Sequence, residues 1–225
     1  IPENRFVGPG EEITDQATAD TLPTLEEADA DTYYTQELLE IDQELREGYI
    51  ELYETEGYQN LLGVGVNPKT SFNPEQVKPQ IDETVKLDEF TRILGDVQIG
   101  EYSIIGRRTA IRADEGTPIL LSRGAIIDDR ITFHALRDTD IVIGENLAVS
   151  DDAVLHGPLE MGNNNIVGGG AVVFRARLGD NVQIGEEAVI AGPAGEDITL
   201  EIPDGTMIPA EAIVTSEEDL EALKN

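Results

Sequence analysis

The residues best suited to catalysis or metal binding in this chain are its two histidines, His134 and His156. Neutral imidazole is a good ligand for zinc and iron, and histidine is the side chain that titrates nearest neutral pH. Because the sequence contains no cysteine, thiolate metal sites and disulfides are excluded. The two histidines are therefore interpreted as metal ligands, and any third ligand must be sought among the carboxylates.

The spacing of the histidines follows a six-residue repeat of apolar residues. Sixteen positions keep the phase, with three breaks: Ile93, Ile99, Ile105, Ile111, Leu121, Ile127, Phe133, Ile143, Val149, Leu155, Met161, Val167, Val173, Leu178, Ile184 and Ile190. A period of six fits neither an α-helix nor an alternating strand, but it fits short parallel strands wound around a triangular prism. The sequence predicts an all-β core, a left-handed parallel β-helix of hexapeptide repeats. The left-handed sense of the helix is inferred from proteins that have this hexapeptide pattern. The period alone does not establish it, because connections between parallel strands are usually right-handed.

This register predicts that the two histidines share one edge of the prism. Each follows a repeat residue by one place, and three sides, or one full coil, separate them, with residues 135–140 as an outward loop. Stacked strands lie about 4.8 Å apart, so two imidazoles on successive coils can share one ion. The same count places Arg112 on this edge one coil earlier. The alternative is that the stacked histidines only form hydrogen bonds along the edge.

Asp151 and Asp152, just before His156, are the nearest candidates for a third ligand. Five extended residues span about 16 Å, so Asp151 cannot reach an ion held by the histidines of its own chain. A neighbouring copy packed about a three-fold axis could supply it. The histidine edge therefore predicts a homotrimer with an interfacial metal ion.

Composition narrows the class of protein. With 225 residues, 40% hydrophobic and 5% aromatic, the chain can bury one principal aliphatic core. A net charge of −31 argues against nucleic acid and anionic membranes as partners, and no apolar run approaches the ~18 residues of a membrane span. The acid excess with few lysines favours a halophilic protein over an ordinary acidic one. The start without methionine slightly favours an extracytoplasmic location; the alternative is the cytoplasm of a salt-accumulating halophile.

Four segments are expected along the chain. Residues 1–33 form an acidic N-terminal arm that is extended or disordered. Residues 34–61 are the segment of an amphipathic helix, and the helical spacing of its apolar residues stops before Gly57. Residues 62–214 form the β-helix domain, which begins with a proline-rich irregular turn. Residues 215–225 start a C-terminal helix behind a capping box at Thr215. The helix at 34–61 is expected to pack on an outer face of the β-helix; the alternative is further assembly with another subunit or partner through residues 1–61.

Three segments resemble the gamma-class carbonic anhydrases: IRADEGTPI at 111–119, DRITFHAL at 129–136 and VLHGP at 154–158. The resemblance extends over about residues 62–216 and includes the IPDG and IPA turns near the end. It implies a homotrimer that reversibly hydrates carbon dioxide to bicarbonate by metal-bound hydroxide at the subunit interface. In that family three histidines from two adjacent subunits bind zinc, or iron in some members.

His134 and His156 match the two ligands of one subunit, and Asp151 stands where the third histidine is donated across the interface. The resemblance implies that Arg112 and Asp129 form a structural ion pair near that interface, with Asp114 beside it. It also implies that Glu115 takes part in proton transfer.

Several positions depart from the family. Asp128 replaces a glutamine that binds the metal-bound water, Ile126 replaces an asparagine, and Arg137 replaces a proton-shuttling glutamate. An aspartate ligand should raise the pKa of bound water above the value of about 7 set by three imidazoles on zinc. We therefore expect a weakened carbonic anhydrase that uses zinc, with iron(II) as the alternative and an empty site as a third case. The competing hypothesis is a non-catalytic trimeric β-helix with a structural or assembly role.

Overall fold

The computed structural model describes residues 2–7, 13–24, 36–57, 63–193, 198 and 200–223. Its contacts divide the chain into two units, Ile1–Glu47 and Gly48–Asn225. The first unit contains a short helix, α1 (Gln16–Thr21), in the arm that was expected to lack regular structure. Asp15 caps this helix by accepting a hydrogen bond from the Thr18 backbone N–H at 2.8 Å. One antiparallel bridge, Arg5 to Thr24, also orders the arm.

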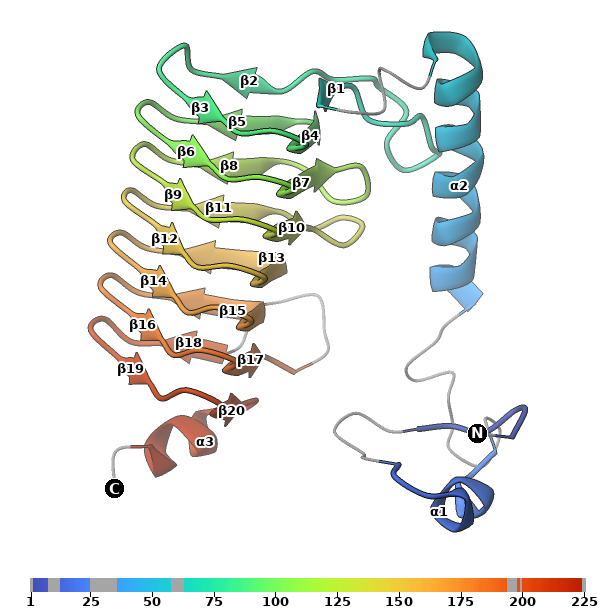
Figure 1. Cartoon of the computed structure of the whole chain (residues 1–225), viewed down its shortest axis with the longest axis vertical. Helices are drawn as coiled ribbons and strands as arrows, with labels where there is room; N and C mark the ends of the chain where they lie inside the picture. Colours follow the sequence, from blue (N-terminus) through green and yellow to red (C-terminus); the bar gives the residue numbers. More distant parts are fainter. Residues whose placement is uncertain are drawn as a thin grey trace. The chain divides into compact units, whose positions relative to one another are not determined.

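The second unit is the predicted left-handed β-helix, in which all the strands pair in parallel with strands one coil away (Figure 1). Its strands are β1 (Val64–Gly65), β2 (Gln80–Ile81), β3 (Lys86–Leu87), β4 (Arg92–Gly95), β5 (Val97–Ile99), β6 (Ile104–Ile105), β7 (Ala110–Ala113), β8 (Ile119–Leu121), β9 (Ile126–Ile127), β10 (Thr132–His134), β11 (Ile141–Ile143), β12 (Ala148–Val149), β13 (Val154–Met161), β14 (Ile166–Val167), β15 (Val172–Leu178), β16 (Gln183–Ile184), β17 (Val189–Ala191), β18 (Leu200–Ile202), β19 (Met207–Ile208) and β20 (Ile213–Val214).

The strands form three faces. The first face stacks β1, β4, β7, β10, β13, β15, β17 and β20, and the second stacks β2, β5, β8, β11, β13, β15 and β18. The long strands β13 and β15 turn the corner and belong to both. The third face stacks β3, β6, β9, β12, β14, β16 and β19. Each coil therefore contributes one strand to each face, as the hexapeptide period predicts.

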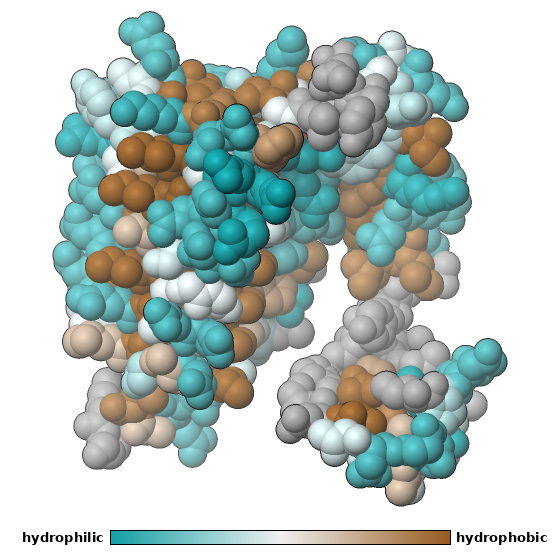
Figure 2. All heavy atoms as spheres, in the orientation of Figure 1, coloured by the Kyte–Doolittle hydropathy of each residue, from teal (hydrophilic) through white to brown (hydrophobic). Residues whose placement is uncertain are grey.

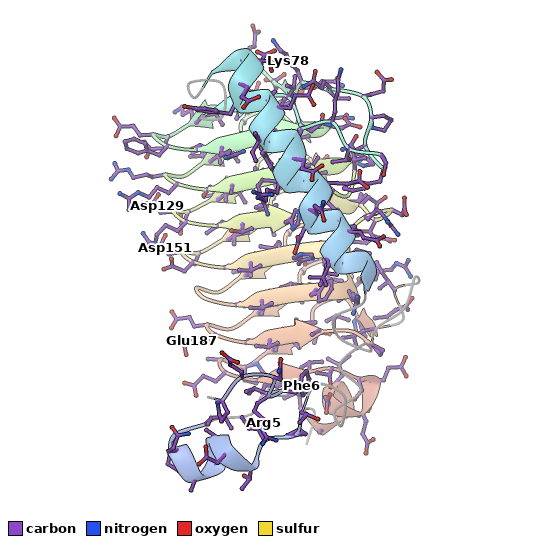
Figure 3. The ribbon with its side chains drawn as sticks, turned by 90° about the vertical axis from the view of Figure 1, so that its right-hand side faces the viewer. Arg5, Phe6, Lys78, Asp129, Asp151 and Glu187 are labelled. Carbon is purple, nitrogen blue, oxygen red and sulfur yellow. The ribbon has the colours of Figure 1, made fainter. Side chains whose placement is uncertain are left out.

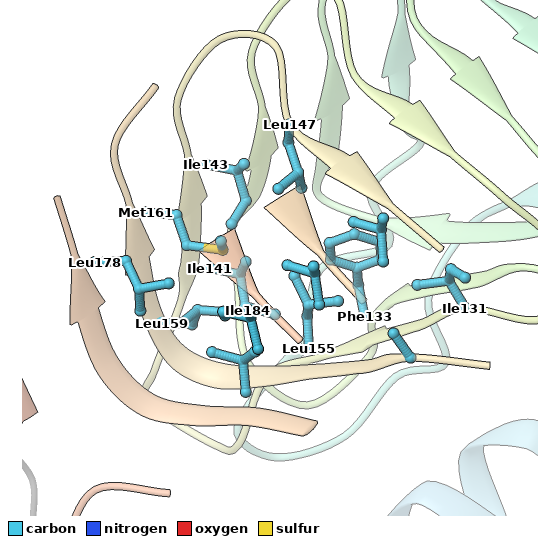
Figure 4. Packing of buried hydrophobic residues seen from close by; sticks show 14 of the residues in the cluster. Ile131, Phe133, Ile141, Ile143, Leu147, Leu155, Leu159, Met161, Leu178 and Ile184 are labelled. Carbon is cyan, nitrogen blue, oxygen red and sulfur yellow. The ribbon is translucent and has the colours of Figure 1, made fainter. Parts of the chain in front are cut away.

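The repeat residues form columns inside the prism. Ile93 pairs with Ile111, Ile111 with Phe133, and Phe133 with Leu155, and all four side chains are fully buried. Figure 4 shows this aliphatic packing from close by. The first two breaks in the sequence period are outward loops, which lengthen a coil without disturbing the pairing of the next strand. The third break lies within β15, which continues around its corner without a separate turn.

The corners are closed by residues in the left-handed region, three places before an inward repeat residue. This holds for Phe90, Tyr102, Arg108, Arg130, Asn146, Asp152, Asn164, Asn181, Glu187 and Glu211, all with φ between 56° and 64°. This conformation is costly for side chains other than Gly, Asn and Asp. Backbone hydrogen bonds to the neighbouring coils hold these corners, for example from the Arg130 N–H to the Arg107 carbonyl at 2.9 Å.

The helix α2 (Gln36–Glu56) agrees with the predicted amphipathic helix. Its residues from Gly48 onward belong to the second unit, where Leu52 is buried. The irregular turn before β2 is organised by the buried Asn67, whose amide donates to the Pro68 and Glu75 carbonyls and accepts from the Val77 N–H. Within the described part of the chain, no helix has the length and apolar content needed to cross a membrane.

The last element of the described chain is the short helix α3 (Glu217–Ala222). Its N-cap is Ser216, one residue later than the predicted Thr215. The Ser216 side chain accepts a hydrogen bond from the Asp219 N–H, and the Asp219 carboxylate accepts from the Thr215 N–H at 2.8 Å. The Asp219 carboxylate thus binds the N–H of the residue before the N-cap, whereas in a capping box it would bind the N–H of the N-cap itself.

We expect Gly116→Ala to destabilise the fold by about 1–3 kcal/mol, because overpacking a filled site has this cost. A Cβ at Gly116 would lie 2.1 Å from the Leu136 carbonyl oxygen and 2.5 Å from the Ala135 Cβ, inside the outward loops. Gly169→Ala is the matched control, since its nearest atom, the Asp151 carbonyl oxygen, is 3.3 Å away. Urea unfolding gives the free energy of unfolding of both variants. An equal loss of stability in the two variants would contradict the close approach at Gly116.

Candidate metal centre

The structure places Arg112, His134 and His156 in one ladder, on the edge where the first face meets the second; we call this the histidine edge. His134 pairs in register with Arg112 on β7 and with His156 on β13. The imidazole centroids are 5.1 Å apart, with the ring planes at 82°. The predicted juxtaposition of the two histidines is therefore confirmed.

Phe174 extends the ladder by one coil. It pairs with His156, and its ring centroid lies 4.9 Å from the imidazole centroid in an edge-on arrangement. The Arg175 guanidinium carbon lies 4.4 Å from the centre of the Phe174 ring. Phe174 was not among the predicted site residues, although it follows Val173 by one place and the same count would have found it.

His156 is held in the form that binds metals. Its Nδ1 lies 3.0 Å from the Gly157 carbonyl oxygen, and this contact favours the tautomer in which Nδ1 donates and Nε2 keeps its lone pair. Burial lowers the pKa of His156 most strongly, and the charges of His134, Arg175 and Arg112 lower it further against the opposing effect of the Gly157 hydrogen bond. The imidazole is therefore neutral at pH 7.

Asp114, which directly follows β7, is fully buried beside the histidine edge. Its Oδ2 accepts a hydrogen bond from the Tyr49 hydroxyl on α2 and lies 3.3 Å from Arg112 Nη1. Burial alone would raise the pKa of this carboxyl, but contacts with His134, Arg112 and Tyr49 outweigh it and lower the pKa to about 2. Burial, followed by the charge of Asp114, raises the pKa of Tyr49, so the phenol remains a donor.

His134 Nε2 lies between two carboxylates. It is 3.3 Å from Asp114 Oδ1 and 3.6 Å from Glu115 Oε2. These distances suit ion pairs, but neither contact is aligned as a hydrogen bond, and both His134 Nε2 and Asp114 Oδ1 are buried without a hydrogen-bond partner. Two carboxylates beside Nε2 favour the tautomer that carries its proton there, which leaves the lone pair of Nδ1 for a metal ion.

Glu115, the candidate for proton transfer, is nearly buried. Its Oε1 accepts a hydrogen bond from the Arg137 backbone N–H at 2.8 Å, so the loop of residues 135–140 positions it. The Arg137 Nε also lies 3.5 Å from the Asp138 carboxylate. Because the backbone N–H of residue 137 is the donor, this hydrogen bond does not depend on which side chain the residue carries.

The remaining predicted site residues lie on another edge, where the third face meets the first; we call it the aspartate edge. It carries Asp128, Asp129 and Asp151, and Figure 3 shows Asp129 and Asp151 projecting on successive coils. Asp151 Oδ1 accepts from the Asp129 N–H at 2.9 Å and Oδ2 from Arg130 at 3.1 Å. The Asp129 carboxylate accepts from the Arg107 N–H at 2.8 Å. The chain does not bring Asp151 to its own histidines, in agreement with the reach of the chain.

The histidine edge of one chain therefore carries two of the three predicted metal ligands. Among the residues that the structure describes, no group of three or more His, Asp or Glu side chains is arranged to hold a metal ion. The predicted pair of Arg112 with Asp129 likewise involves two different edges, and within the chain the ionic partner of Arg112 is Asp114. Both features stay predictions for an assembly of copies.

An exposed apolar column lies on the outside of the third face. Ile104, Ile126, Ala148 and Ile166 pair in register from coil to coil, and the three isoleucines are 43%, 52% and 47% exposed. In Figure 2 brown residues form this column over β6, β9, β12 and β14. Ile126, noted as a departure from the family, belongs to it. The column was missed in the sequence, although each member directly precedes a repeat residue.

Comparisons with known proteins agree with this geometry. No family model matches the chain. The chain is 30% identical over 176 residues to a carbonic anhydrase from Methanosarcina thermophila, with 70% of this chain and 68% of that protein covered. It is 31% identical over 166 residues to the carboxysome assembly protein CcmM of Nostoc sp., covering 69% of this chain but 29% of that protein. The carnitine operon protein CaiE of Escherichia coli is 32% identical over 117 residues, covering 52% of this chain and 56% of that protein.

The match to the Methanosarcina protein extends over more than two thirds of both chains. The chain belongs to the gamma-class carbonic anhydrase family.

Proposed function

We propose that this protein reversibly hydrates carbon dioxide at a metal site shared between copies in a homotrimer. His134 and His156 of one copy and Asp151 of the next are the proposed ligands. The observation that carries this proposal is the histidine pair itself. The His134 imidazole faces two carboxylates through its Nε2, which favours a lone pair on Nδ1, and the His156 imidazole is neutral with its Nδ1 close to a carbonyl oxygen.

The donor set of two imidazoles and one carboxylate fits zinc and also iron(II). When bound, either ion would supply the Lewis acidity that lowers the pKa of a coordinated water. The protein supplies the surroundings. Asp114 sets the orientation of His134, and Phe174 excludes water from the other side of His156.

Glu115 is the proposed proton carrier. Its Oε1 is fixed by the Arg137 N–H, and its Oε2 faces His134 at 3.6 Å. Oε2, which faces the histidine edge, is proposed to take a proton from the reacting water and pass it outward. Asp128 would approach from the neighbouring copy beside Asp151, where its carboxylate can accept a hydrogen bond but, when ionised, cannot donate one.

The apolar column on the third face supports the trimer. Three isoleucines in one line on an otherwise acidic surface favour a covered interface over a solvent-exposed one. The aspartate edge borders this face. Packing the third face of one copy against the histidine edge of the next would bury the column and bring Asp151 toward His134 and His156.

The present contacts of Asp151 point to a weakened site. Its carboxylate is already held by Arg130 and by the Asp129 N–H, so binding a metal must replace both contacts. An anionic ligand also donates more charge to the metal than a neutral imidazole. Lower metal affinity and less reactive water at neutral pH follow from these two effects.

The contacts of Asp151 also favour the second candidate function, a non-catalytic trimer with a role in assembly. In that case the carboxylate only strengthens the corner with Arg130 and Asp129. The similarity to a carboxysome assembly protein in Nostoc is in line with this alternative. Metal content and hydration activity separate the two functions.

We expect His156→Ala to abolish stoichiometric metal binding and to lower carbon dioxide hydration at least 100-fold, because half of the ligand pair is lost. Metal analysis of anaerobically purified protein and stopped-flow hydration measure these effects. Gln98→Ala, an exposed residue of β5, is the control and should match the wild type. If the wild-type protein contained no metal, or if His156→Ala kept full activity, the proposed enzymatic function would be refuted and the assembly role would be favoured.

Asp151→His should bind zinc about tenfold more tightly than the wild type, or ~1.4 kcal/mol, since a neutral imidazole replaces a carboxylate held by Arg130. Arg130→Gln should also tighten zinc binding in the wild-type background, because it releases Asp151. The same change should have no effect when residue 151 is histidine. Chelator competition measures the dissociation constants, and unchanged affinity in both single variants would remove Asp151 from the ligand set.

Ile126→Glu should dissociate the trimer and abolish metal binding together, because a carboxylate would replace an isoleucine in the middle of the buried column. Val142→Glu is the matched control, since Val142 is 37% exposed on the second face, away from the column. Sedimentation velocity gives the oligomeric state. A trimer that survives Ile126→Glu would place the interface elsewhere.

A further inference from the structure

The contact of Tyr49 with Asp114 joins α2 to the histidine edge. Tyr49 lies outside the segment that resembles the family, and 65 residues separate it from Asp114. Its hydroxyl donates to Asp114 Oδ2, while Asp114 Oδ1 faces His134 Nε2 at 3.3 Å. A single carboxylate thus connects the helix to a candidate metal ligand.

The C-terminal part of α2 is fixed firmly enough to hold this contact. Gly48 lies so close to the irregular turn that a Cβ there would be 2.7 Å from the Lys69 carbonyl oxygen. Leu52, one turn further along the helix, is only 4% exposed. The Arg92 guanidinium lies over the Tyr49 ring, 5.1 Å from its centre. Backbone approach, side-chain burial and ring stacking therefore all constrain the position of the hydroxyl.

Tyr49 is the contact that sets the rotation of the Asp114 carboxylate. The other contact of Oδ2, Arg112 Nη1, is longer at 3.3 Å, and the Arg112 side chain is 33% exposed, whereas Tyr49 comes from the fixed part of α2. If the phenolic hydroxyl were absent, the carboxylate could rotate toward Arg112 and turn Oδ1 away from His134. Second-shell carboxylates of this kind fix the ring orientation of metal-binding histidines.

We propose that Tyr49 is a positioning residue of the metal site, which it acts on through Asp114. Through Tyr49, the helix α2 then helps to orient the Asp114 carboxylate and, with it, His134. This inference rests on the proposed metal-binding function, because positioning of His134 matters only if His134 is a ligand.

The test uses the full chain and zinc as the probe. Tyr49→Phe should raise the zinc dissociation constant 10- to 100-fold, the usual effect of losing a second-shell partner, with a small change in urea unfolding. Tyr102→Phe is the control, because Tyr102 is 67% exposed on a corner of the β-helix. Leu220→Ala removes packing of α3 against β18 and β20, so it should lower stability and leave the zinc affinity unchanged.

A double-mutant cycle shows whether Tyr49 acts through Asp114. In an Asp114→Asn background, Tyr49→Phe should cause no further loss of zinc affinity. An equal loss in both backgrounds, or wild-type affinity in Tyr49→Phe, would overturn the proposal.

Metal-free protein gives a readout that is separate from the proposed function. The chain has two histidines, so their ring signals in NMR spectra can be assigned with His156→Ala. Tyr49→Phe should shift the ring signals of His134, whereas Tyr102→Phe should not. Wild-type protein that binds no zinc would refute the proposed function, and unchanged His134 signals in Tyr49→Phe would refute the positioning role of Tyr49.

Discussion

The parallel pairing between coils is the constraint on which the rest of the structure depends. Each strand forms hydrogen bonds with the strand one coil before it, so a residue takes its direction from its place in the repeat. Inward columns such as Ile111, Phe133 and Leu155 make a shift of register costly, because a slip by one residue would turn apolar side chains outward. The alignment of His134 over His156 is a by-product of this core.

The outward loops show how the pairing tolerates irregular lengths. The coils from Ile111 to Phe133 and from Phe133 to Leu155 are both longer than three hexapeptides, yet Phe133 still pairs with Ile111 on one side and Leu155 on the other. The extra residues leave the prism at the histidine edge, beside the groups that could do chemistry. Through its backbone N–H, the second loop also positions Glu115. Irregular sequence is thus concentrated where the site needs side chains outside the regular repeat.

Much of the fold and half of the site could be predicted from the sequence, because both follow from counting. The aliphatic period predicted the columns, and its phase placed Arg112, His134 and His156 on one edge. Tyr49 could not be found in this way, since α2 lies outside the repeat and its contact with Asp114 depends on three-dimensional packing. The isoleucine column was not predicted because an exposed position can carry a polar or an apolar residue. Only the buried positions must be apolar in every coil, so only they produce a period in the sequence. The bonds of Asp151 to Arg130 and Asp129 depend on corner geometry that the period does not encode.

The stacking of coils also determines which insertions and deletions this lineage can accept. In a solenoid each coil contacts only its neighbours, so a whole coil gained or lost beyond Phe174 would leave the pairing of His134 with His156 unchanged. A single residue inserted between the two histidines, other than in the outward loop, would face one imidazole away from the other. Changes in overall length are therefore compatible with the pairing of the two histidines, whereas changes of phase are not. Descendants of such a protein can vary widely in length while keeping the spacing from Phe133 to Leu155.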